Sequence, residues 1–194
     1  MICAFPPPVH GQSLVSLALR EKLQADRLPV RAIDIGARGR RGLAYHVTRA
    51  VSVARAGVAL LGGRYRHVYF SSEAGFGVLY LLLLLPAARL RGLPRTLQHH
   101  VYSYINAPTR LHRLLMRAAG PTCRHLLLSP RMAADFARAY GDALPLAVMR
   151  NSITIERSLV DESRSPRAPN RPGRLTIGFI GRLEAAKGFD DFLA

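Results

Sequence analysis

The chain has 194 residues, of which 49% are hydrophobic, enough for one full domain with a substantial core and part of a second. Its formal net charge of +16 comes almost wholly from arginine. The charge favours an anionic partner, either a nucleotide sugar or an anionic lipid surface. The alternative is that the arginine excess reflects genomic base composition alone. The one local cluster, Arg38-Gly39-Arg40-Arg41, has no aromatic residues interleaved for base stacking, so nucleic acid is excluded as the favoured partner.

Short apolar runs alternate with longer helical segments along the chain. The predicted strands are residues 2–5, 30–35, 67–71, 96–100, 125–129 and 147–150. The predicted helices are residues 13–24, 45–61, 76–90, 110–119 and 131–140. Repeated strand–helix–strand units predict a doubly wound α/β domain, in which a parallel, Rossmann-like sheet carries helices on both faces.

Residues 78–85, inside one predicted helix, are all apolar. Spanning a bilayer takes about 20 residues, so this run is too short to cross one. A helix buried in the domain core is the favoured interpretation, and a contact with the membrane surface is the alternative.

The two cysteines and the first residues bear on the compartment. Cys3 and Cys123 form neither a CxxC pair nor a metal-ligand cluster, and Cys3 is expected to be a small core residue. No secretory signal pattern precedes the first predicted strand. These features predict a cytoplasmic protein without a bound metal.

The composition changes after residue 155. We predict an N-terminal domain over residues 1–155, a polar linker rich in proline and arginine over 156–174, and the start of a second domain over 175–194. The apolar strand expected at 175–180 would need cover on both of its faces. We therefore expect the chain to be the first half of a longer protein, cut just inside its second Rossmann-like domain.

In such folds ligands bind beyond the carboxyl ends of the strands, and the first of these ends is a Pro/Gly-rich loop. His10 and Gly11 lie there, where a glycine lets a ligand approach the backbone and the next helix offers unpaired N–H groups to a phosphate. An ordinary turn is the alternative. The loop is not a GxGxxG fingerprint, so a nicotinamide cofactor is not supported.

Two histidines follow the fourth predicted strand. Side chains alternate along a strand, so only one of His99 and His100 can point into a cleft, as a base or as a hydrogen-bond donor to a sugar hydroxyl. A structural histidine bonded to a loop carbonyl is the alternative. Tyr102, Tyr104 and Asn106 come next and could line an acceptor pocket or pack the loop.

Glu73 ends the third strand and could bond a sugar, although a carboxylate at a helix start is the commoner explanation. No second carboxylate is placed to form a hydrolytic pair. Arg182 and Lys187 flank a short turn between an apolar strand and a helix. Both cations can converge on the helix N-terminus, which suits a diphosphate.

The residues at this turn resemble a known family. Gly181-Arg182-Leu183-Glu184-Ala185-Ala186-Lys187-Gly188 is similar to the "GRL-x-x-x-KG" turn of the family-4 retaining glycosyltransferases with the GT-B fold. Weaker likenesses agree in order along the chain: the loop Pro6-Pro7-Pro8-Val9-His10-Gly11, a histidine after the fourth strand, the "S-x-x-M…YG" pattern from Ser129 to Gly141, and Asn151 followed by Ser152-Ile153.

The resemblance implies an acceptor-binding N-terminal domain and a donor-binding C-terminal domain, with no metal or cofactor besides the nucleotide-diphosphate sugar. Arg182 and Lys187 would stabilise the departing diphosphate, Gly11 would let the first loop approach it, and His99 or His100 would touch the transferred sugar. The acceptor would be a glycan or lipid-linked saccharide, with possible peripheral contact between the protein and the inner membrane face. We expect the 194 residues alone to be inactive.

Two alternatives to a glycosyltransferase remain open. One is a basic α/β module that binds an anionic membrane without catalysis. The other is a GT-B relative that epimerises a sugar nucleotide.

Overall fold

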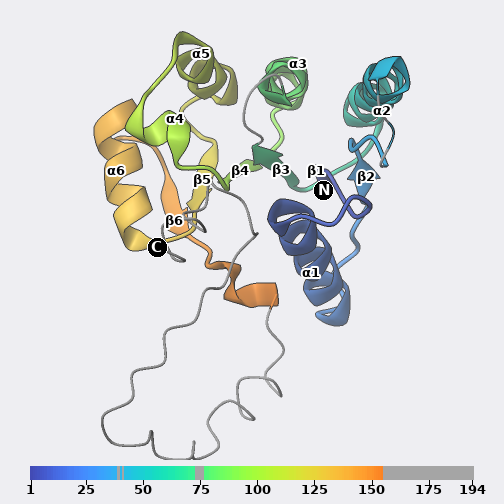
Figure 1. Cartoon of the computed structure of the whole chain (residues 1–194), viewed down its shortest axis with the longest axis horizontal. Helices are drawn as coiled ribbons and strands as arrows, with labels where there is room; N and C mark the ends of the chain where they lie inside the picture. Colours follow the sequence, from blue (N-terminus) through green and yellow to red (C-terminus); the bar gives the residue numbers. More distant parts are fainter. Residues whose placement is uncertain (39, 41, 73–76, 155–194) are drawn as a thin grey trace, which may run out of the picture. The chain divides into compact units, whose positions relative to one another are not determined.

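The computed structural model of the chain describes residues 1–38, 40, 42–72 and 77–154 (Figure 1). The chain divides into two units, Met1–Glu156 and Arg157–Ala194, and the described residues all belong to the first. The linker predicted at 156–174 and the second-domain start predicted at 175–194 lie outside the described residues.

Six strands form one sheet in which every neighbouring pair runs parallel, in the order β2-β1-β3-β4-β5-β6. They are β1 (Ile2–Cys3), β2 (Ile33–Asp34), β3 (Val68–Ser72), β4 (Arg95–His99), β5 (Arg124–Leu127) and β6 (Leu146–Val148). Each predicted strand is found, with bounds that differ by a few residues. The predicted doubly wound α/β class is confirmed.

The helices are α1 (Gly11–Ala25), α2 (Gly42–Gly62), α3 (Gly77–Leu90), α4 (Ser103–Asn106), α5 (Arg110–Ala119) and α6 (Pro130–Tyr140), followed by the 3₁₀ turn η1 (Asn151–Thr154). All five predicted helices are present, whereas α4 and η1 were not predicted, because four residues are too few to show a hydrophobic period. Local chemistry fixes several ends. The Thr109 and Ser129 hydroxyls accept backbone N–H groups at the starts of α5 and α6.

The helices cover the two faces of the sheet unequally. In Figure 1, α2, α3 and α5 lie together on one face, and α1 lies on the other. α3 packs between α2 and α5, while α6 contacts β5 and β6 at the end of the sheet. Parallel sheets need cover on both faces, and this arrangement supplies it.

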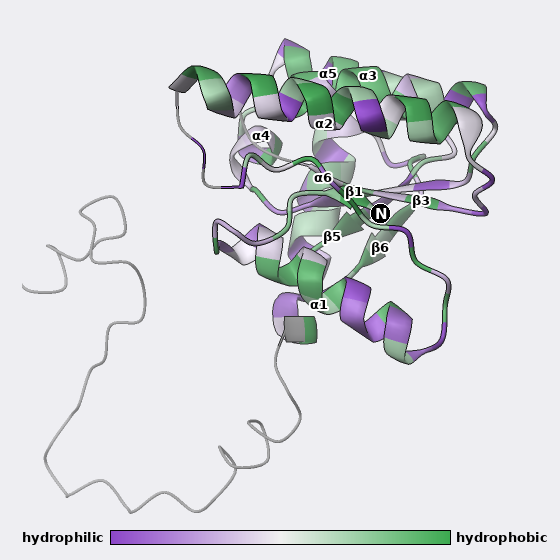
Figure 2. Ribbon diagram, turned by 90° about the vertical axis from the view of Figure 1, so that its right-hand side faces the viewer, coloured by the Kyte–Doolittle hydropathy of each residue, from purple (hydrophilic) through white to green (hydrophobic). Residues whose placement is uncertain are grey.

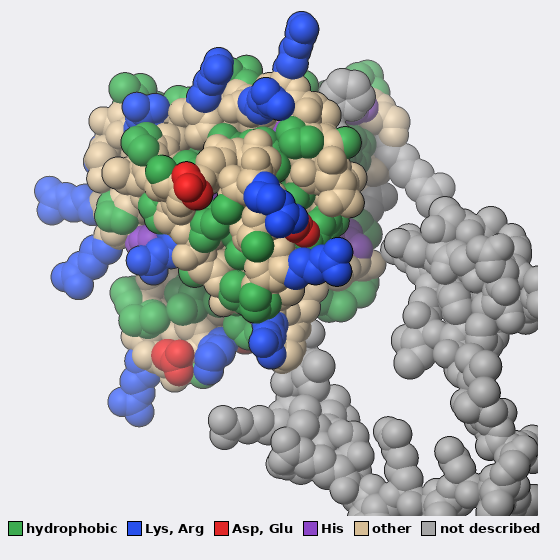
Figure 3. All heavy atoms as spheres, turned by 90° about the vertical axis from the view of Figure 1, so that its left-hand side faces the viewer, with side chains coloured by type: hydrophobic (Ala, Val, Ile, Leu, Met, Phe, Trp, Pro, Cys, Tyr) green, Lys and Arg blue, Asp and Glu red, His purple; other side chains and the backbone are tan. Residues whose placement is uncertain are grey.

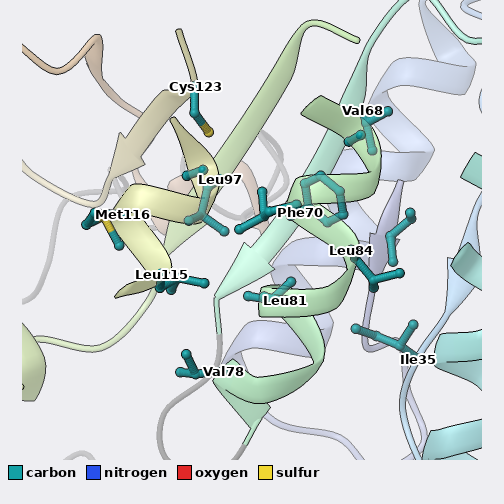
Figure 4. Close-up of a cluster of buried hydrophobic side chains, with 14 of the residues drawn as sticks. Ile35, Val68, Phe70, Val78, Leu81, Leu84, Leu97, Leu115, Met116 and Cys123 are labelled. Atoms are coloured by element: carbon teal, nitrogen blue, oxygen red, sulfur yellow. The ribbon is translucent and has the colours of Figure 1, made fainter. Parts of the chain in front are cut away.

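The main core lies between the sheet and the layer formed by α2, α3 and α5, called here the helix layer. Phe70 and Leu97 of the strands meet Leu81, Leu84 and Leu115 of the helices, and all five are essentially buried (Figure 4). A smaller cluster on the α1 face contains Cys3, Phe5 and Tyr69. Because successive strand residues face opposite ways, Tyr69 and Phe70 enter different clusters. The burial of Cys3 confirms its predicted place in the core.

The apolar run 78–85 divides between two environments. Val78, Leu81 and Leu85 are buried, as expected for a core helix, but Leu79 and Leu83 are 45% and 67% exposed. Among the helices that the structure describes, none is long and apolar enough to cross a membrane.

The two sides of α3 provide a matched stability test. Leu85→Ala removes a fully buried side chain and should lower the free energy of unfolding by about 2–5 kcal/mol. Leu83→Ala, two residues away and 67% exposed, should change it by less than about 0.5 kcal/mol. Urea unfolding of both variants checks this orientation of α3, and equal losses would contradict it.

Candidate functional site

The strand order reverses at β1, which lies between β2 and β3. The chain leaves β1 through α1 toward β2, and then returns through α2 to β3 on the other side of β1. The loops after β1 and β3 therefore lead to opposite faces of the sheet, the first to α1 and the second to α3 (Figure 1). In doubly wound sheets the crevice at such a reversal, beyond the carboxyl ends of the strands, is where ligands bind.

The loop after β1 is fixed to the start of α1 by reciprocal hydrogen bonds. His10 is the N-cap: its Nδ1 accepts from the Ser13 backbone N–H at 3.2 Å, and its own N–H donates to the Ser13 hydroxyl at 3.1 Å. The cap leaves Gly11 as the first helical residue, and a Cβ added there would meet no atom within 4 Å. The space beside Gly11 is thus open to a ligand.

Gln12 joins the two sides of the reversal. Its side-chain amide nitrogen donates to the Ser71 hydroxyl at 2.8 Å and lies 3.4 Å from the Ser72 carbonyl oxygen, both at the end of β3. This bond connects the first turn of α1 to a strand 59 residues further along the chain. It ties the start of α1 to the end of β3, the strand paired with β1.

A hollow of about 290 Å³ opens beside this junction, beyond the ends of β1 and β2. His10, Gln12, Arg40, Tyr45 and Arg49 line it. Its charged lining residues are basic, so it suits a hydroxyl-rich or anionic group.

Local contacts hold the cations of the hollow in place. The Arg49 guanidinium lies 4.5 Å from the ring centre of Tyr80 and donates to the Tyr45 hydroxyl at 2.8 Å. Arg40 donates to the Thr48 hydroxyl at 2.8 Å. Arginine suits such a site because its planar group can stack on a ring and still present donors.

Asp34 ends β2 beside the hollow, but its carboxylate serves its own loop. Oδ1 accepts from the backbone N–H groups of Gly36 at 2.8 Å and Phe5 at 3.3 Å, and Oδ2 accepts from Arg38 at 3.2 Å. A Cβ at Gly36 would approach Oδ1 to 3.0 Å, so a larger residue there would crowd the carboxylate. Asp34 is therefore a loop-organising residue.

The structure separates the two histidines of the fourth strand. His99 is fully buried on the core side, whereas His100 is partly exposed and lies near enough to His10 for their charges to interact. Burial first, and repulsion from His10 second, lower the pKa of His100 to about 4. Its Nε2 is buried without a hydrogen-bond partner among the described residues. His100 is thus the neutral imidazole on the side of the first loop.

His99 belongs to a buried polar network. Its Nδ1 contacts the Tyr104 hydroxyl and its Nε2 contacts Nδ1 of His125, both at 2.9 Å. The Tyr104 ring stacks on His112 at 4.2 Å between centres. Burial lowers the pKa of His99 well below its usual value, lowers that of His125 to about 4, and raises that of Tyr104. All these rings are therefore neutral in the folded protein near pH 7.

The remaining predicted site residues are dispersed. Tyr104 packs in the core, Tyr102 bonds the Asp135 carboxylate of α6, and Asn106 is exposed at the end of α4. Glu73, Arg182 and Lys187 lie outside the described residues. The described ranges contain no group of three or more His, Cys, Asp or Glu that could hold a metal ion.

A larger hollow of about 950 Å³ lies at the opposite edge of the sheet. Met1, Arg31 and His67 line it, and these residues precede β1, β2 and β3. It therefore lies at the amino ends of the strands, away from the edge where doubly wound sheets bind ligands.

Comparison with protein-family models, with curated proteins and with solved structures gave no match for this chain. The candidate site thus rests on its own geometry. Of the residues at this edge, His10, Gly11 and His100 were predicted as site candidates from the sequence, and Gln12 and Arg49 were not. The position of Gln12, directly after the glycine at a helix start, was a usable signal. Arg49 had none, because it lies mid-helix and reaches the hollow only through the packing of α2.

The buried histidines predict a pH dependence of stability. Their folded pKa values lie below the usual 6.5, so the unfolded chain binds more protons as the pH falls beneath 6.5. Stability should therefore fall between about pH 6.5 and 4, by about 1.4 kcal/mol per pH unit for each such histidine. The variant His99→Leu/His125→Leu should show a shallower fall in urea unfolding at pH 7, 6 and 5. If the free energy of unfolding of the variant fell with pH as steeply as that of the parent chain, His99 and His125 would not be neutral in the folded protein.

Proposed function

We propose that the described unit is the acceptor-side domain of a retaining, metal-independent glycosyltransferase, which transfers a sugar from a nucleotide-sugar donor to a glycan or lipid-linked saccharide. The observation that carries this proposal is the convergence of Gly11, Gln12 and His100 at the carboxyl edge of the sheet, beside its strand-order reversal. The resemblance at Arg182 and Lys187 supports the same function.

His100 has the properties that recognition of a sugar requires. An imidazole with a pKa of about 4 is neutral at physiological pH and can donate from one nitrogen and accept at the other. Its Nε2 lacks a partner among the described residues, and such a buried atom gains by bonding a sugar hydroxyl. We assign His100, in preference to His99, as the histidine that would contact the transferred sugar.

The first loop and the distant cations would act on the diphosphate. The open space beside Gly11 lets the backbone at the start of α1 approach it. Arg182 and Lys187 would offset the charge that develops as the bond between sugar and diphosphate breaks. The basic hollow lined by Arg40 and Arg49 would hold part of the acceptor.

His100 provides the direct test, in a protein that carries the donor-binding domain. His100→Ala should lower nucleotide-sugar turnover by about 100-fold or more, because a positioned hydrogen-bonding group near the reaction centre is lost. His46→Ala, an exposed histidine of α2, is the matched control and should keep the full rate. Release of the nucleoside diphosphate in the presence of acceptor is the measurement. Full activity of His100→Ala would contradict the role.

The unit Met1–Glu156 alone should bind an acceptor without turnover, because Arg182 and Lys187, which are proposed to act on the diphosphate, lie outside it. Measurable transfer by this unit would contradict the assigned division of roles. Interconversion of the nucleotide sugar without any acceptor would identify an epimerase instead.

A further inference from the structure

The outward face of α2 carries exposed apolar side chains from its first turn to its last, with Arg55 among them. Leu43, Val47, Val51, Val58 and Leu61 are 79%, 53%, 45%, 72% and 54% exposed. They are separated by three, four or seven residues, the spacings that place side chains on one side of a helix. The opposite side of α2 packs in the core through other apolar residues, so the helix is hydrophobic around most of its circumference.

The neighbouring helices extend this surface. On α3, Leu79, Leu83 and Leu90 are 45%, 67% and 85% exposed, and on α5 Leu114 is 50% exposed. Because α3 packs against both α2 and α5, the exposed side chains form one area across the helix layer. Figure 1 shows the three helices side by side, and in Figure 2, which views the layer from the side of α2, much of α2 and α3 is coloured as hydrophobic. A large apolar area on a surface marks a binding face.

The charge of the layer has one sign. Residues 42–134 contain twelve arginines and a single acidic residue, Glu73, which lies outside the described residues. Arg55 is exposed within the apolar face of α2, and Arg110, Arg113 and Arg117 are exposed on α5. In Figure 3, which views the side of α5 and α6, basic side chains project among apolar ones and few acidic groups appear.

We propose that the outer face of α2, α3 and α5 docks on an anionic lipid bilayer. Leucine and valine side chains would enter the acyl boundary, while arginines beside them reach the phosphates with their apolar stems along the surface. No described helix can cross a bilayer, so the contact is interfacial.

Charge distinguishes this occupant from a second copy of the chain. A two-fold interface places the same surface on both sides. Arginine-bearing faces without described acidic residues would then oppose each other, and like charges at an interface repel. An anionic bilayer complements both the apolar and the basic side chains.

The proposed membrane-binding face lies next to the candidate site. Docking on a bilayer does not itself depend on the proposed function. α2 and α3 follow β2 and β3, so both helices begin at the carboxyl edge of the sheet. Leu43 is exposed in the first turn of α2, near Tyr45, which lines the basic hollow. A bilayer on the helix layer would thus lie beside the site.

Vesicle co-sedimentation tests the proposal. The chain should bind vesicles of phosphatidylcholine with phosphatidylglycerol at least tenfold better than phosphatidylcholine alone, and raising salt from about 0.1 to 0.5 M should weaken this binding. Val58→Glu/Leu83→Glu should reduce binding to anionic vesicles by about tenfold or more, because two inserted apolar groups become charged. Both positions are exposed, so unfolding curves should stay unchanged.

Leu28→Glu is the matched control, since Leu28 is 51% exposed but lies outside the helix layer. It should bind like the parent chain. Equal binding to neutral and anionic vesicles, absence of binding, or full binding by the double variant would overturn the proposal. A dimer in sedimentation velocity that Val58→Glu/Leu83→Glu dissociates would also overturn it, by assigning the face to a second copy.

Discussion

Every strand of the sheet runs in the same direction, and the structure depends on this constraint. All strands end at the same edge of the sheet, so loops that are distant in sequence lie close together there. These loops carry His10, Gln12, Ser71 and His100. Parallel strands also need cover on both faces, which requires a helix after nearly every strand. The same rule that assembles the candidate site therefore creates the helix layer.

Some polar side chains lie in the interior of the domain, and some large apolar side chains lie on its surface. The sheet buries His99, His125 and Tyr104 in a hydrogen-bonded network, while leucines and valines of α2 and α3 face outward. The buried network is tolerated because its rings are neutral and bond one another, although Nε2 of His125 is buried without a partner among the described residues. No described part of the chain covers the exposed apolar face. The proposed contact with a bilayer would remove these side chains from water.

The sequence predicted the element order because alternation of apolar runs and helical segments is a local property. It could not choose between His99 and His100, since strand alternation fixes only that they face opposite sides; packing against Tyr104 and His125 decides which side is the core. The Gln12–Ser71 bond spans 59 residues and has no local signal. Residues 78–85 gave no amphipathic pattern because every one is apolar, so the exposure of Leu79 and Leu83 was not predictable.

Ligand is proposed to bind at the carboxyl edge of the sheet, beside the strand-order reversal. Amide NMR of the isotope-labelled chain, titrated with nucleotide sugars and candidate acceptors, can locate the binding site. The chemical-shift changes should concentrate at the backbone amides of Gly11, Gln12, Ser71 and His100. Changes confined to the opposite edge, around Met1, Arg31 and His67, would contradict it.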